Sequence, residues 1–214
     1  MSSIYFYKLT CDDGGAPCVR HGLLSLAICK PFIRMGAKPG DLIFGFAANS
    51  LCRDNRLIYI AKVTDKKTGG EYYELPAFQN RDDCIYERVN GRFRWRSGGK
   101  YHGQDHLSHD LGEEGSYERA DVLLSNDFRY LGDRGTADYK QQFPAVKRAI
   151  EDLGRGYRRH HDEDLRGELE KLAGEAWQRI EETGRPTQAP SRGACHRSRS
   201  CGVIGSDPSA IRSP

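Results

Sequence analysis

A short polar segment at residues 101–110 holds the side chains of this chain that are best suited to chemistry. Its ionisable members, three imidazoles and two carboxylates, are His102, Asp105, His106, His109 and Asp110. Spacings of three and four residues would bring such side chains together if the segment is helical. An imidazole can act as a general base or hydrogen-bond the edge of a nucleobase. Three imidazoles with a carboxylate also suit zinc or another first-row metal.

The role of this segment stays open, because an exposed polar loop that is solvated and paired with nearby arginines would have the same composition. The sequence contains no H-E-x-x-H motif and no H-x-E followed by P-C-x-x-C. Neither a zinc protease nor a zinc deaminase is therefore indicated. We predict no metal and no cofactor, and we retain four candidate catalytic residues: His102, His106, His109 and Asp110.

A second candidate site comprises Lys30 and Arg34, which lie four residues apart around Pro31. Proline breaks a strand and can start a helical turn, and residues four apart share one face of such a turn. Lysine and arginine both contact phosphate oxygens, lysine as a point charge and arginine in a bidentate manner. We expect the pair to bind a nucleotide phosphate. The alternative is a solvated basic edge or an ion pair with Asp41.

Basic and aromatic residues are interleaved further along the chain, around Arg94, Trp95 and Arg96. The arginines of such a segment can contact phosphate, and an aromatic ring gives a surface on which a base can stack. We therefore include these three residues among the candidate nucleotide-binding residues. A half-buried strand with a solvated basic face would show the same alternation, so the pattern alone does not decide between the two.

The turn after residue 125 offers a third set of nucleotide-binding candidates. Asn126 and Asp127 could read the edge of a base, and Tyr130 could stack on it. The structural alternative is that the two polar residues only turn the chain while the neighbouring aromatic rings fill the core. For Phe128 we expect the core role.

The elements that must position these residues are strands first and helices later. Apolar, aromatic and β-branched runs predict strands at residues 4–9, 23–29, 41–47, 57–64 and 120–125, with 128–131 as a possible continuation. A long polar insert occupies about residues 66–118. Within it, Asn90-Gly91 predicts a hairpin between residues 84–88 and 92–96. Apolar residues at helical spacing predict helices at residues 143–154 and 162–183. This order favours an α+β fold over a doubly wound sheet.

The charge of the chain gives only a local clue. The 214 residues contain 33 Lys and Arg against 30 Asp and Glu, a formal net charge of +3. The excess lies beyond residue 184, in a segment rich in Ser, Arg, Gly and Pro that we predict to be a disordered tail. No stretch is apolar enough to cross a membrane and no secretory signal is present, so we expect a cytoplasmic protein.

Two patterns resemble known families. A Pro-Gly turn with Asp41 entering a strand, followed by a second strand, is similar to the PUA-like superfamily, in particular its EVE and ASCH members. A fuller pattern resembles the nucleotide modification associated domain families, in particular the second of them. It consists of Cys29-Lys30-Pro31-x-Ile33-Arg34, Gly40-Asp41 and Val122-Leu123-Leu124-Ser125-x-Asp127-Phe128-x-Tyr130-x-Gly132.

The resemblance implies a PUA-like open β-barrel with flanking C-terminal helices. We expect the barrel domain at residues 1–160, a helix packed on or beside it at 161–184, and the tail at 185–214. The implied function is a module that binds a nucleotide or modified base in a cleft, linked to DNA base modification. Two alternatives are an enzyme acting on a nucleobase or nucleotide through residues 102–110, and a protein-interaction domain that uses the C-terminal helix. The oligomeric state is left open.

Overall fold

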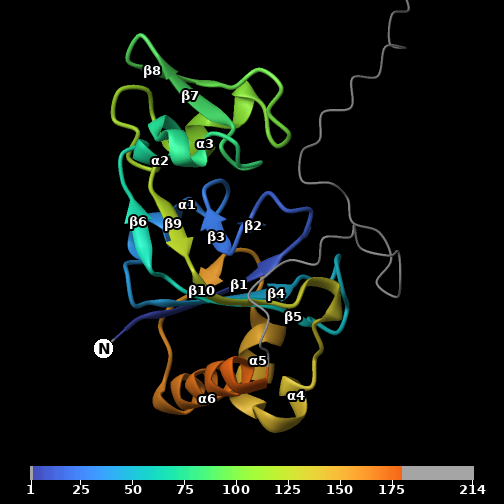
Figure 1. The fold of residues 1–214 in the computed structure, drawn as a ribbon. Coiled ribbons are helices and arrows are strands. Elements are labelled where there is room, and N and C mark those ends of the chain that lie inside the picture. Colours follow the sequence, from blue (N-terminus) through green and yellow to red (C-terminus); the bar gives the residue numbers. More distant parts are fainter. Residues whose placement is uncertain (1, 180–214) are drawn as a thin grey trace, which may run out of the picture.

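The computed structural model describes residues 2–179, in which sheets and helices form separate layers (Figure 1). This confirms the α+β class predicted from the order of the elements. The described strands form a five-stranded, a four-stranded and a two-stranded sheet. No closed barrel is present among these strands. The predicted tail at residues 185–214 lies outside the described residues.

The five-stranded sheet is the centre of the fold and has the order β10-β5-β4-β1-β11. Its strands are β1 (Ile4–Leu9), β4 (Leu42–Ala47), β5 (Leu57–Lys62), β10 (Asp127–Tyr130) and β11 (Tyr157–Arg158). β1 and β4 are parallel, and the other pairs are antiparallel. Both faces of β1 are buried from Ile4 to Tyr7, as this run of apolar and aromatic residues requires.

One face of this sheet is covered by three helices (Figure 1). They are α4 (Tyr139–Gln142), α5 (Pro144–Asp152) and α6 (Glu163–Arg179). Leu165, Leu169 and Leu172 of α6 are buried against the same cluster as Phe6 of β1. Glu168 of α6 also accepts hydrogen bonds from the first main-chain N–H groups of α5. The apolar stripe of α6 therefore packs against the protein's own core.

The opposite face of the central sheet packs against the four-stranded sheet, whose order is β2-β3-β9-β6. Its strands are β2 (Cys18–Arg20), β3 (Leu23–Leu26), β6 (Asp65–Lys67) and β9 (Val122–Ser125). β9 has a period of two: Leu123 packs toward the central sheet, whereas Val122 and Leu124 pack into a third cluster. The polar insert supplies most of that third cluster.

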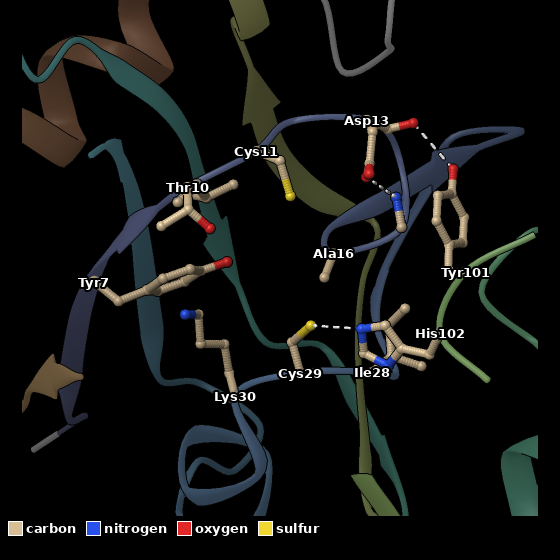
Figure 2. A pocket seen from close by; sticks show the side chains of 12 residues that line it. Tyr7, Thr10, Cys11, Asp13, Ala16, Ile28, Cys29, Lys30, Tyr101 and His102 are labelled. Atoms are coloured by element: carbon tan, nitrogen blue, oxygen red, sulfur yellow. Dashed lines mark hydrogen bonds between the residues drawn. The ribbon is translucent and has the colours of Figure 1, made fainter. Parts of the chain in front are cut away.

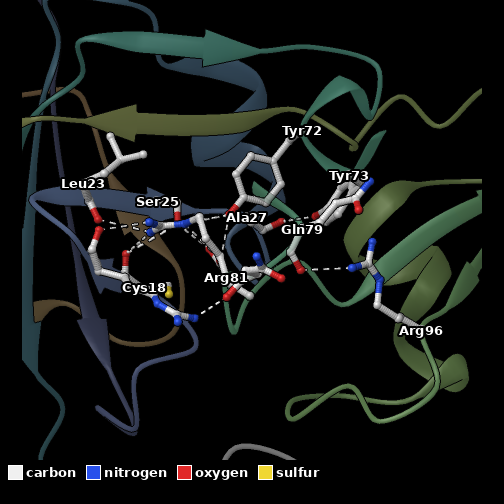
Figure 3. A network of polar contacts seen from close by, with 12 residues as sticks. Cys18, Leu23, Ser25, Ala27, Tyr72, Tyr73, Gln79, Arg81 and Arg96 are labelled. Carbon is white, nitrogen blue, oxygen red and sulfur yellow. Dashed lines mark hydrogen bonds and ion pairs between the residues drawn. The ribbon is translucent and has the colours of Figure 1, made fainter. Parts of the chain in front are cut away.

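The insert folds over the four-stranded sheet as a compact layer, at the top of Figure 1. It contains the hairpin β7 (Tyr86–Val89) and β8 (Arg92–Trp95), the helices α2 (Glu71–Glu74) and α3 (Leu107–Leu111), and the 3-10 turns η1 (Pro76–Phe78) and η2 (Gln104–His106). A buried polar network joins this layer to the sheet (Figure 3). In it the Arg81 guanidinium donates to Ser25 and to the carbonyl oxygens of Cys18 and Leu23.

One predicted strand is shorter in the structure. The strand expected at residues 23–29 ends at Leu26, and Cys29 and Lys30 adopt left-handed backbone conformations with φ of 57° and 44°. The chain then enters the short helix α1 (Pro31–Gly36), which begins at the proline. A 3-10 turn, η3 (Gly132–Arg134), follows β10. The predicted Asn90-Gly91 hairpin is confirmed, with positive φ at both turn residues.

None of the described helices is both long and apolar enough to span a membrane.

Candidate active site

A pocket lies where the end of β1, the turn between β3 and α1, and the insert meet (Figure 2). It encloses about 400 Å³ of empty space, part of which is open to solvent. Its wall combines apolar and aromatic side chains with a thiol, an ammonium and an imidazole. The residues that carry its chemistry are Tyr7, Cys29, Lys30, Tyr101 and His102.

A thiol, an imidazole and a carboxylate form a linear series at this pocket. The sulfur of Cys29 lies 3.4 Å from Nε2 of His102, and Nδ1 of His102 lies 2.6 Å from Oδ2 of Asp110. Cys29 is a free cysteine of intermediate exposure, whereas His102 and Asp110 are buried. A nucleophile beside a base that is oriented by a third group is the geometry of a catalytic triad.

Asp110 is held by contacts that fix both of its oxygens. Oδ1 accepts a hydrogen bond from the main-chain N–H of Cys29 at 2.9 Å, and Oδ2 accepts one from the Tyr86 hydroxyl at 2.9 Å as well as contacting His102. Burial alone would raise the pKa of this carboxyl. The hydrogen bond from His102 and the nearby positive charges outweigh that effect and lower it. Asp110 is therefore ionised and can orient the imidazole.

His102 carries a strongly perturbed imidazole. Burial tends to lower its pKa, but the hydrogen bonds to Asp110 and Cys29 raise it from 6.5 to about 10. The imidazole is consequently protonated at neutral pH. A cation beside a cysteine sulfur stabilises the thiolate, which is the nucleophilic form of the side chain.

The local backbone explains how Cys29 reaches the pocket. Left-handed conformations at two successive non-glycine residues are sparsely populated and cost about 1–3 kcal/mol each, so packing must hold them. Here the apolar run before Cys29 is buried, and Pro31 after Lys30 fixes the start of α1. The sharp turn between strand and helix places the thiol at the pocket wall.

Arg34 stabilises this turn through hydrogen bonds to main-chain carbonyl oxygens. Its side chain is fully buried, and its guanidinium donates to the carbonyl oxygens of Cys29 and Asp110 at 2.7 and 2.6 Å. It also donates to the carbonyls of Arg119 and Asp121. The predicted phosphate contact does not fit this placement, because the guanidinium is enclosed and its donors already have partners. Arg34 instead positions both ends of the triad.

Lys30 is brought into the same pocket as the thiol. Its Nζ lies 4.9 Å from the centre of the Tyr7 ring, and the Tyr7 hydroxyl bonds that of Tyr59 at 2.9 Å. Lys30 and Arg34 therefore do not share a face, although their spacing predicted one. The alternative, an ion pair of Lys30 or Arg34 with Asp41, does not form either, since Asp41 accepts hydrogen bonds from the main chain of Ser3 and Lys38.

The other histidines of residues 101–110 lie outside the triad. The ring of His106 stacks on that of His102 with centroids 4.6 Å apart, and His109 is exposed. The segment is not one helix, since η2 and α3 divide it. Within residues 2–179 no group of three or more His, Cys, Asp or Glu side chains could hold a metal ion.

The interleaved basic segment belongs to the β7–β8 hairpin and lies away from the pocket lining. Arg94 pairs with Glu87, and Arg96 donates to the main chain of Gln79. Trp95 is partly buried and donates through its indole N–H to the carbonyl of Tyr101. Much of the basic charge of this hairpin is neutralised by neighbouring acids.

The turn after β9 also lies apart from the pocket. Asn126 is exposed, and Asp127 accepts a hydrogen bond from the indole N–H of Trp177 in α6 at 2.6 Å. Tyr130 is buried and donates to Asp12, and Phe128 is fully buried, as its expected core role requires. Sequence reasoning thus grouped these residues with a cleft that they do not line.

Cys29 is the pocket residue that the sequence prediction does not single out. It belongs there only to a family motif, because nothing in a sequence marks one cysteine as the neighbour of a histidine 73 residues away. The local signal is its position directly before Lys-Pro at the end of an apolar run, where the chain passes from strand to helix.

Comparison with curated proteins and with solved structures finds no match. Comparison with family profiles finds one, described as nucleotide modification associated domain 2, over residues 1–192. The matched range includes α6, which we expected to lie outside the resemblance. With most of its length matched, including every element of the pocket, the chain belongs to the nucleotide modification associated domain 2 family.

Proposed function

We propose that this protein is a cysteine-dependent enzyme of nucleotide modification, in which Cys29 attacks an electrophilic carbon of the substrate. The observation that carries this proposal is the series Cys29–His102–Asp110, with contacts of 3.4 and 2.6 Å, at the wall of a pocket. A module that only binds a base needs no such series. The geometry therefore favours the enzyme alternative over the binding module.

The reaction class that fits best is acyl transfer from an amide or ester. In the thiolate form that the His102 imidazolium stabilises, the Cys29 sulfur adds to the carbonyl carbon and the C–S bond forms. The bond to the leaving group breaks, and His102 gives its proton to the leaving amine or alcohol. The neutral imidazole then takes a proton from water or from a second amine or hydroxyl, which attacks the thioester; the C–S bond breaks, and the thiolate and the imidazolium are restored. Asp110 keeps the imidazole oriented throughout and stabilises its charge.

The family assignment supplies the second half of the proposal. The family's description associates it with nucleotide modification, so we infer that the acyl donor or acceptor is a nucleotide or a modified base. A PUA-like relation of the two larger sheets, and the domain boundaries at residues 160 and 184, remain part of the same proposal. We expect the enzyme in the cytoplasm, where reducing conditions keep a catalytic thiol reduced.

Thiol reactivity tests the nucleophile without knowledge of the natural substrate. The full-length protein is treated with limiting iodoacetamide at neutral pH, and alkylation of each cysteine is followed by peptide mass spectrometry. Cys29 should react faster than buried Cys84, and His102→Asn should slow it about tenfold or more, because the imidazolium that stabilises the thiolate is removed. His109→Asn, an exposed histidine of the same segment, is the matched control and should change nothing.

Acyl transfer is tested with p-nitrophenyl acetate, an activated ester. The wild-type protein should release a burst of one p-nitrophenolate per chain and carry one acetyl group on Cys29, whereas Cys29→Ser should show no burst. Absence of a burst together with ordinary reactivity of Cys29 would refute the proposal and return the binding module to first place.

A further inference from the structure

Lys30 brings a positive charge into the pocket without a matching negative charge. Figure 2 shows its side chain extending across the pocket toward Tyr7, beside the thiol of Cys29. Among the residues that the structure describes, its Nζ makes no ion pair, whereas twelve other basic–acidic pairs do form. The Tyr7 ring face is its contact instead, and such a cation–π contact brings no negative charge to balance the ammonium.

The carboxylate in the pocket wall does not balance this charge. Asp13 lines the pocket, but its Oδ1 accepts a hydrogen bond from the main chain of Gly15, and no ion pair joins it to Lys30. Burial lowers the pKa of Lys30, and the sulfur of Cys29 is the neighbour that opposes this effect. A partly buried ammonium of this kind is stabilised when an anion enters the pocket.

We propose that Lys30 forms an anion-binding subsite next to Cys29, so that the substrate carries a carboxylate or phosphate close to the carbon that the thiol attacks. This inference rests on the proposed function and specifies the substrate class of the same site. A lysine is suited to this role because its ammonium is a point charge with three donors and accepts varied anion geometries. Arg34 is excluded from it because its guanidinium is enclosed.

A role of Lys30 as a counter-ion of the thiolate can be distinguished from anion binding by the charge of the reagent. If Lys30 served only as a counter-ion of the Cys29 thiolate, its removal would slow every electrophile by the same factor. If it binds an anionic group of the substrate, its removal slows anionic electrophiles selectively. Two alkylating reagents of almost equal size, iodoacetate and iodoacetamide, differ in that charge and form the same kind of C–S bond with loss of iodide.

The experiment measures the alkylation rates of Cys29 with both reagents by peptide mass spectrometry, relative to a neutral free thiol, N-acetylcysteine amide. In the wild-type protein the ratio of the iodoacetate rate to the iodoacetamide rate should exceed that of the free thiol by about fivefold or more, as expected for one partly solvated charge pair. Lys30→Met should abolish the excess, and Lys30→Arg should retain most of it. Lys38→Met, which removes an exposed lysine beyond α1, is the matched control and should leave the ratio unchanged.

Anion binding is also measured without the thiol. The melting temperature is recorded in acetate and in inorganic phosphate against chloride at constant ionic strength, because an anion that binds the folded protein raises it. The more strongly stabilising ion distinguishes carboxylate from phosphate, and Lys30→Met should remove the effect. Equal slowing of both reagents in Lys30→Met, or no Lys30-dependent anion effect in either assay, would overturn the subsite. A Lys30-dependent anion effect with an inert Cys29 would keep the subsite and overturn the proposed function.

Discussion

The carboxylate of Asp110 accepts a hydrogen bond from the main-chain N–H of Cys29 at 2.9 Å, across 81 residues of sequence. Its other oxygen contacts the His102 imidazole at 2.6 Å. One side chain thus fixes the backbone of Cys29 and the ring of His102 at the same time. Because Asp110 belongs to the insert and Cys29 to the turn after β3, the site exists only when these two parts of the fold are packed together.

Replacement of this carboxylate should affect both stability and reactivity. In the wild-type protein the two oxygens of Asp110 accept hydrogen bonds from neighbouring donors. In Asp110→Asn one of these oxygens becomes an N–H₂ group, which cannot accept, so a buried donor is left without a partner. We expect the free energy of unfolding to fall by about 2–4 kcal/mol, and the alkylation rate of Cys29 to fall with it. Urea denaturation and peptide mass spectrometry measure the two effects. Asp105→Asn, an exposed neighbour, should change stability by less than about 0.5 kcal/mol; an equal loss in both variants would contradict the assigned role.

The imidazole of His102 should make stability depend on pH. Its pKa is raised from 6.5 to about 10 in the folded protein. Such a group contributes stability that is fully present below pH 6.5 and is lost as the pH rises toward 10. Relative to His102→Asn, the wild-type protein should therefore lose on the order of 3 kcal/mol of unfolding free energy across this window. Denaturation at a series of pH values checks this, and parallel curves for the two proteins would refute it.

Loss of the Arg34 guanidinium should be among the most damaging single changes. Arg34→Met keeps much of the volume but leaves four buried or partly buried carbonyl oxygens without their donor. We expect a loss of about 3–5 kcal/mol. The exposed pair of Arg92 with Glu114 is the comparison, since Arg92→Met should cost less than about 0.5 kcal/mol. If Arg34→Met were as mild as Arg92→Met, Arg34 would not be the residue that holds the turn.

A methyl group at Gly45 should disturb the packing of Tyr59, which supports Tyr7 of the pocket wall. An added Cβ would lie 2.2 Å from the ring of Tyr59, whose hydroxyl bonds that of Tyr7. Gly45→Ala should therefore destabilise the protein by about 1–3 kcal/mol. Gly174 of α6 has no atom within 4 Å of such a Cβ, so Gly174→Ala should stabilise by about 0.5–1 kcal/mol through helix propensity. Thermal denaturation of both variants tests the opposite signs.

The sequence pattern predicted strands and helices correctly where interactions between residues close in sequence determine the local structure. The run 4–9 gave β1 at its observed bounds, and Asn90-Gly91 gave the hairpin, because left-handed conformations suit those two residue types. The prediction failed at residues 27–29, which are apolar enough to continue β3. There the buried contacts of Arg34 and Asp110 hold a turn that the composition of the segment does not reveal.

The sequence by itself determined the α+β class, the family and the residues from which a site could be built, Lys30 and the segment 101–110 among them. Only the tertiary structure decided which of these side chains meet. It joined His102 and Asp110 to Cys29 and enclosed Arg34 among carbonyl groups. The physical reason is that an active site depends on contacts between residues more than 70 positions apart, whereas sequence periodicity reports only on neighbours within a few turns of the chain.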